Sequence, residues 1–109
     1  MDMAGDLIKV GACSMAALPG DIEENLKKIK NWTETGIEEG IELLLFPELS
    51  LSGYWTNTEL YYEAQSQEGQ AVQELIEFLQ SMEKDISISV GLAEDYGGAV
   101  YNTQITLNQ

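Results

Sequence analysis

Apolar residues recur along the chain with two different spacings, which separate predicted helices from predicted strands. Between positions 22 and 37 the recurrence is every three or four residues, the spacing that places side chains on one face of an α-helix. Asp21 precedes this segment and Glu24 follows three residues later, a spacing typical of a helix N-cap. Gly36 or Gly40 can end the helix. The stripe consists of Ile22, Leu26, Ile29, Thr33 and Ile37.

Two early segments predict buried strands. Residues 7–15 (LIKVGACSM) are mostly apolar or small, with Ile8 and Val10 on one face and Cys13 on the other, so we expect a mostly buried strand. Residues 41–46 (IELLLF) are too short and too continuously apolar for a surface helix, and they predict a second strand.

The rest of the chain predicts one clear helix, a helical turn before it and two more strands. A helix is expected after Gly69, and residues 58–64 predict a separate helical turn before it. Residues 86–94 and 100–107 are typical of strands, and the glycine-rich DYGGA between them indicates a turn. The helical stripe consists of Val72, Leu75, Ile76, Leu79 and Met82.

The predicted order is therefore β-α-β-α-β-β, an α/β fold with a largely parallel start and a closing hairpin. Because each predicted helix has a single apolar stripe, we expect the helices to cover one face of the sheet. A length of 109 residues suits one domain or a large piece of one.

The composition limits the classes of partner that we expect for this chain. Nineteen acidic residues stand against five lysines, with no arginine or histidine, and the formal charge is -14. Nucleic acids and anionic membrane surfaces attract cationic proteins, so neither is an expected partner. Without histidine, the chain lacks the commonest zinc ligand and the commonest general base near neutral pH, and we expect no metal or other cofactor.

The single cysteine and the N-terminal residues indicate the cellular compartment that we expect for the protein. Cys13 is the single cysteine and cannot form a disulfide within the chain, and the first ten residues are acidic where a secretory signal is basic. No apolar run approaches the roughly 20 residues that cross a bilayer. We expect a cytoplasmic protein in which Cys13 is a buried, inert core residue.

One carboxylate follows the second predicted strand, in the segment FPELSLSGY. Ligands of α/β sheets gather at the carboxyl ends of the strands, and Pro47 stiffens the backbone just before Glu48. The apolar neighbours Phe46 and Leu49 predict a raised pKa for Glu48, which suits a general base near neutral pH. The alternative is an ordinary loop glutamate that faces water or caps an amide.

The segment FPELSLSGY resembles the glutamate motif of the nitrilase, or carbon-nitrogen hydrolase, superfamily. The segments IKVGACSM, GDIEENLKKI, EGQAVQELIEFL, ISVGLAE and VYNTQITL resemble the family's strands and helices around that motif, from Ile8 to Gln109. The resemblance implies an α-β-β-α sandwich, of which this chain is the N-terminal half, and a Glu-Lys-Cys triad. Such enzymes act on non-peptide amide, nitrile or carbamoyl bonds of small molecules. Glu48 falls on the general base, and the triad's lysine and cysteine would follow Gln109.

With one member of the triad present, we expect the chain as given to be inactive. A sheet face without helices also predicts a homo-oligomer. Two alternatives remain: a non-catalytic binding or oligomerisation module derived from the hydrolase fold, and an unrelated acidic α/β domain.

Several residues near the acid have competing interpretations. Tyr54 and Trp55 are candidates for lining a substrate pocket, with packing as the equal alternative. Ser50 and Ser52 have no histidine partner, which argues against a serine hydrolase. Asn102 is assigned to the strand or its turn.

The lysines are assigned structural roles. Lys84 lies at a predicted helix end, where it favours the helix dipole and pairs with neighbouring acids. Lys27, Lys28 and Lys30 are expected on a solvated helix face.

Overall fold

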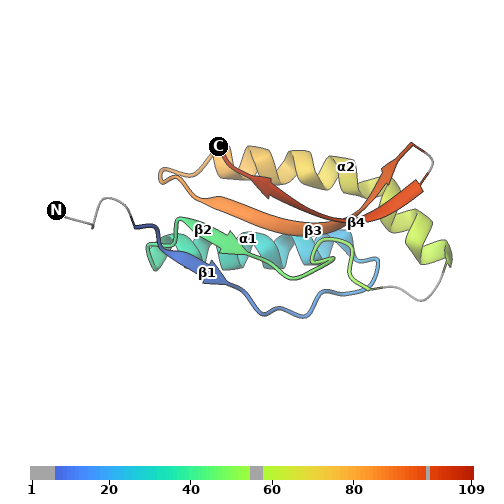
Figure 1. The fold of residues 1–109 in the computed structure, drawn as a ribbon, viewed down its shortest axis with the longest axis horizontal. Coiled ribbons are helices and arrows are strands. Elements are labelled where there is room, and N and C mark those ends of the chain that lie inside the picture. Colours follow the sequence, from blue (N-terminus) through green and yellow to red (C-terminus); the bar gives the residue numbers. More distant parts are fainter. Residues whose placement is uncertain (1–6, 55–57, 98) are drawn as a thin grey trace.

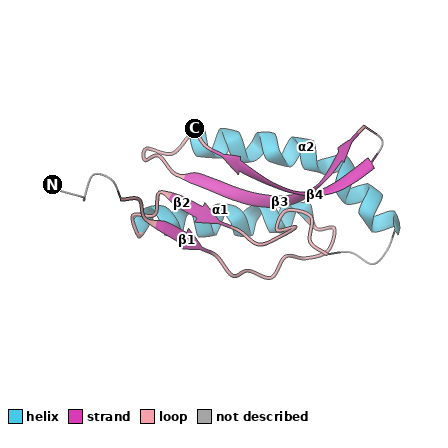
Figure 2. Cartoon of the chain, in the orientation of Figure 1, coloured by secondary structure: helices cyan, strands magenta, loops and turns pink. Residues whose placement is uncertain are grey.

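The computed structural model describes residues 7–54, 58–97 and 99–109, and its four strands form one sheet with two helices on one face (Figures 1 and 2). The sheet order is β1 (Val10–Ala12), β2 (Leu43–Leu45), β3 (Ser87–Tyr96) and β4 (Ala99–Leu107). The first three strands are parallel neighbours, and β4 is antiparallel to β3. Helix α1 (Ile22–Glu38) joins β1 to β2, and α2 (Thr58–Gln80) joins β2 to β3. The predicted α/β fold and element order are confirmed.

Helix α1 begins and ends near the residues predicted to bound it. Asp21 is the N-cap, and its carboxylate accepts a hydrogen bond from the Glu24 amide at 3.1 Å. Gly36 lies inside the helix and is buried against β2. Gly40 follows the helix with a φ of +77°, a conformation that glycine adopts without strain.

The hydrophobic core lies between the helices and the sheet. Ile29 of α1, Leu75 of α2 and Ile88 of β3 have no exposed surface. The wider core comprises Ile22, Leu26, Leu44, Phe46, Leu51, Ala71, Leu79, Ile86, Val90 and Leu92. We call the opposite side of the sheet, which carries Val10, Leu45, Gly91 and Asn102, the open face.

The first strand is shorter and more exposed than predicted. Leu7 and Val10 are 70% and 50% exposed, and Cys13 is half-buried rather than fully buried. The reason is that β1 is an edge strand with a neighbour on one side only, and its open face has no covering layer. Cys13 packs against the core on the helix side, where burial raises the pKa of its thiol.

The second helix is continuous where a turn and a separate helix were predicted. Gly69 lies within α2, and a methyl group at this position would meet no atom within 4 Å. Glycine lowers the stability of a helix by about 1 kcal/mol relative to alanine, but it keeps its backbone donor. The helix therefore runs through Gly69.

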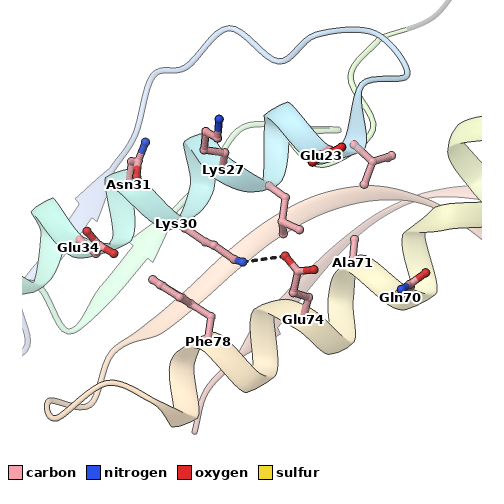
Figure 3. A pocket seen from close by; sticks show the side chains of 11 residues that line it. Glu23, Lys27, Lys30, Asn31, Glu34, Gln70, Ala71, Glu74 and Phe78 are labelled. Carbon is pink, nitrogen blue, oxygen red and sulfur yellow. Dashed lines mark hydrogen bonds and ion pairs between the residues drawn. The ribbon is translucent and has the colours of Figure 1, made fainter.

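Lys30 joins the two helices, so its assignment to a solvated face is wrong. Its Nζ lies 2.7 Å from the Glu74 carboxylate of α2 and 5.6 Å from the centre of the Phe78 ring (Figure 3). The packing of α2 beside α1 brings these groups together. Lys27 remains exposed and lies 3.9 Å from the Glu24 carboxylate.

Candidate active site

The loop after β2 lies directly on the open face of β3. The Leu51 amide donates to the Gly91 carbonyl at 2.9 Å, and the Gly91 amide donates to Ser50 Oγ at 3.0 Å. A Cβ at position 91 would lie closest to the Leu49 backbone nitrogen and 2.9 Å from both the Pro47 oxygen and the Glu48 carbonyl carbon, closer than real Cβ contacts allow. Glycine at 91 therefore permits the backbone of the Glu48 loop to touch the sheet.

The loop is also tightly turned. Leu49 has a φ of +52°, a left-handed conformation that costs a non-glycine residue about 1 kcal/mol or more. The Ser50 amide donates to the Pro47 carbonyl at 3.1 Å, and the Gly53 amide donates to the Leu49 carbonyl at 2.6 Å. These bonds add to the stiffness expected from Pro47 and fix the backbone on both sides of Glu48.

Two amide side chains anchor the loop from outside. Asn25 of α1 is fully buried, and its Nδ2 donates to the Leu51 carbonyl at 3.0 Å and to the Leu18 carbonyl at 2.8 Å. Its Oδ1 accepts from the Leu18 amide at 2.7 Å. Gln104 of β4 donates to the Phe46 carbonyl at 3.0 Å. The loop is thus tied both to α1 and to the last strand.

Both carboxylate oxygens of Glu48 are hydrogen-bonded. The Tyr54 hydroxyl donates to Oε2 at 2.6 Å, and the Asn102 side-chain amide donates to Oε1. These bonds, that of Tyr54 first and that of Asn102 second, stabilise the ionised form and lower the pKa of Glu48. The same bond to Glu48 raises the pKa of Tyr54.

The expected raised pKa of Glu48 is therefore wrong. Phe46 is buried in the core on the helix side of the sheet, and the Glu48 side chain is exposed on the other side. Desolvation acts on the Glu48 carboxylate only as the weakest of the causes that shift its pKa. Neighbours in sequence had suggested an apolar environment, but β2 ends at Leu45, and the loop with its tight turn at Leu49 carries Glu48 to the side opposite Phe46.

The other nucleophile and cation candidates lie away from this carboxylate. Ser50 is buried and uses its Oγ to hold Gly91. Ser52 is buried, and within the described residues its Oγ has no hydrogen-bond partner. Cys13 packs on the helix side of the sheet. Lys84 precedes β3, at the end of that strand far from the Glu48 loop, and forms no ion pair with any described residue, so its predicted acid pairing is wrong.

Asn102 is the site residue that the sequence interpretation missed. It pairs with Ala93 in the antiparallel register, which puts it on the same face as Gly91 and the Glu48 loop. The signal was present in the predicted hairpin, because a short turn at DYGGA fixes which residues of the two strands are opposite. Trp55, the other pocket candidate, lies outside the described residues.

A hollow of about 560 Å³ lies in the helix layer, away from Glu48. It is formed by α1 and α2, with the Lys30–Glu74 ion pair and Phe78 among its lining groups (Figure 3). Among the described residues, no group of three or more acidic or cysteine side chains is placed to hold a metal ion. No helix in the described part of the chain is both long and apolar enough to cross a membrane.

The fold and the site together define an α/β protein that presents a hydrogen-bonded carboxylate in the loop after a parallel strand. The model of the carbon-nitrogen hydrolase family matches residues 9–109, and the chain belongs to this family. The resemblance seen in the sequence motifs is thereby confirmed.

Several known proteins are similar to this chain in sequence or in fold. An (R)-stereoselective amidase from a Pseudomonas species is 29% identical over 98 residues, which cover 90% of this chain and 35% of the amidase. A glutamine-dependent NAD(+) synthetase from Cytophaga hutchinsonii has a similar fold, with a TM-score of 0.72 and 26% identity over 92% of this chain and 17% of that protein. An amidase from Nesterenkonia shares the fold, with a TM-score of 0.65 and 20% identity over 91% of this chain and 36% of the amidase. The chain thus spans about a third of each amidase.

Proposed function

We propose that this chain carries the general base, Glu48, of a carbon-nitrogen hydrolase that acts on small amide-type molecules. The observation that carries the proposal is the Glu48 carboxylate, held at both oxygens by Tyr54 and Asn102 on a loop within the family match. The similarity to an (R)-stereoselective amidase favours an amide over a nitrile or carbamoyl substrate. Tyr54 borders the carboxylate and is our candidate for contacting the substrate.

In the proposed reaction, Glu48 accepts the proton of a cysteine thiol, and the thiolate attacks the substrate's carbonyl carbon. A lysine stabilises the tetrahedral oxyanion. The carbon-nitrogen bond then breaks, and the proton held by Glu48 leaves on the amine. Water hydrolyses the thioester, giving the carboxylic acid and restoring the thiol. The lowered pKa of Glu48 keeps the carboxylate ionised at neutral pH, the form that accepts the first proton.

We propose further that residues 1–109 form the N-terminal portion of the hydrolase domain. The chain spans 35% of the amidase relative, and the triad's lysine and cysteine are not among its matched motifs. Without a nucleophile, the 109-residue chain turns over no amide.

The proposal is tested by expressing the coding sequence as it continues past Gln109. A continuation that encodes a lysine and a cysteine, each after a further strand, should hydrolyse amides. Glu48→Gln should reduce kcat/KM by about 10²-fold or more, because glutamine cannot accept the proton. Glu77→Gln, the same substitution on the exposed side of α2, is the matched control and should leave kcat/KM unchanged.

Two outcomes would overturn this function. One is amide hydrolysis by the pure 109-residue chain that Glu48→Gln abolishes, since the chain would then be complete without the triad. The other is a stop codon directly after Gln109 with stable expression of the folded chain, which would favour a non-catalytic binding or oligomerisation module.

We propose that the open face packs against another sheet and that, in the isolated chain, a second copy supplies it. Val10 is 50% exposed and Leu45 is 39% exposed on this face, in neighbouring strands. A charge of -14 argues against nucleic acid and anionic membranes as partners, and a single cysteine suits a reducing cytoplasm.

A further inference from the structure

The two hydrogen-bond partners of Glu48 differ in how strongly the fold restrains their backbones. Asn102 lies within β4, where continuous pairing with β3 fixes its backbone from Ala99 to Leu107. Tyr54 lies at the end of the loop, outside any helix or strand, although the side chains of both residues are exposed. A strand residue keeps its position while a loop aromatic exchanges contacts, so Asn102 is the more permanent partner.

The two donors also differ in chemistry. The Asn102 Nδ2 can only donate, so an oxygen that faces it is a poor place for a proton. The Tyr54 hydroxyl can donate to a carboxylate and, after rotation, accept from a carboxylic acid. Oε1, which faces Asn102, is therefore disfavoured as the site of protonation, and Oε2, which faces Tyr54, can be either ionised or protonated.

We propose that Asn102 is a positioning residue for Glu48: it fixes Oε1 and leaves Oε2 as the oxygen that exchanges the proton, with Tyr54 as a displaceable partner of Oε2. The inference rests on the proposed role of Glu48 as the base. The end torsion of a glutamate side chain is broad and two-fold, so a free carboxylate would exchange its two oxygens. A fixed amide donor on one of them selects a single orientation.

The first test uses the unaltered 109-residue chain and needs no turnover. In an NMR titration with ¹³C detection of the Glu48 carboxyl, we expect a pKa below the ordinary value of 4.5. The side-chain amide signals of Asn102 should move with the same midpoint. Amide signals that do not respond while Glu48 titrates would overturn the proposal.

Substitutions at Asn102 separate positioning from folding. Asn102→Ala should raise the pKa of Glu48 toward its ordinary value, and Asn102→Asp should raise it further, because a like charge then faces Oε1. General unfolding would instead bring Glu48 to the ordinary value in both variants. Thr106→Ala, on the same face of β4 but opposite Ser89, is the matched control and should leave the Glu48 titration unchanged.

The decisive outcome is whether the Tyr54 bond to Glu48 depends on Asn102 or the Asn102 bond depends on Tyr54. In Tyr54→Phe, the Asn102 amide signals should still follow the Glu48 titration. In Asn102→Ala, the pKa of Tyr54 should fall toward its ordinary value of 10.0, because the carboxylate no longer stays oriented toward the hydroxyl. The reverse dependence would make Tyr54 the positioning residue. Because no reaction is measured, failure here is distinct from failure of the proposed function.

Discussion

Two glycines, Gly91 and Gly69, have opposite structural roles. Gly91 lies where the Glu48 loop touches β3, and a side chain there would press against backbone atoms that cannot rotate away. Gly69 lies in α2 with open space around the position of a Cβ. Gly91 is therefore needed for the close approach of the Glu48 loop to β3, whereas Gly69 only weakens its helix.

We predict that Gly91→Ala lowers the free energy of unfolding by about 1–3 kcal/mol, the usual result of overpacking a close contact. The Glu48 loop should also move, since backbone atoms of Leu49, Glu48 and Pro47 would clash with the added methyl group. Gly69→Ala is the matched control and should raise the free energy of unfolding by about 1 kcal/mol. Urea unfolding of both variants measures the difference, and an unchanged midpoint for Gly91→Ala would contradict the packing described.

At the same scale, the position of Glu48 was predictable and its environment was not. The apolar run before it and Pro47 located the acid at a strand end. One of its two hydrogen bonds comes from Asn102, which lies 54 residues away and meets it only through the register of β3 and β4. The apolar neighbours therefore predicted a raised pKa, where the hydrogen bond from Tyr54 and, second, the one from Asn102 lower it.

At the scale of elements, the sequence predicted the order of helices and strands, but not the continuity of α2 or which strand would be exposed. An apolar pattern cannot distinguish an edge strand from a central one, so β1 was expected to be buried. The sequence also did not predict how the elements pack together. Lys30 was expected in water, but it forms an ion pair with Glu74 of the other helix. Asn25, in the first turn of α1, was not predicted to have a role, although it ties that helix to the site.

We predict that Asn25→Asp destabilises the protein by about 3 kcal/mol or more. The carboxylate cannot donate to the Leu18 and Leu51 carbonyls. The Leu18 carbonyl keeps its bond from the Asp21 amide, but the Leu51 carbonyl loses the bond from Asn25, which costs about 1–3 kcal/mol, and a charge without a cationic partner is buried in addition. Asn31→Asp, an exposed position on α1, is the control and should change stability by less than about 0.5 kcal/mol. Thermal and urea unfolding test both, and equal effects would show that Asn25 does not anchor the loop.

At the scale of the whole molecule, the two sides of the sheet differ. Helices cover one side, whereas the open face combines exposed apolar groups on β1 and β2 with mostly small and polar residues on β3 and β4, where Val100 is an exposed apolar exception. The sequence predicted a bare face but not its division into an apolar part and a polar part. That division follows from the register of β3 and β4, which places these pairs on the open face: Ser89 with Thr106, Gly91 with Gln104 and Ala93 with Asn102. The apolar part next to the edge strand is the surface on which we expect association.

We predict that the 109-residue chain self-associates and that added salt strengthens the association by screening the charge of -14. Leu45→Gln should weaken association because Leu45 lies on the open face. Trp32→Gln, which removes an apolar group that is 46% exposed on α1, is the control and should leave it unchanged. Sedimentation velocity over a range of concentrations measures this, and a monomer at high concentration and high salt would argue against it.

The span between Glu48 and Asn102 has a consequence for synthesis. A ribosome adds about 5–20 residues per second, so the 54 residues that separate the two take about 3–11 s to make. During that interval the nascent chain holds the acid and Tyr54 but neither β4 nor the amide that fixes Oε1. The carboxylate therefore lacks its Asn102 bond until the last strand pairs, and the part of its lowered pKa that comes from Asn102 arises only when the hairpin closes.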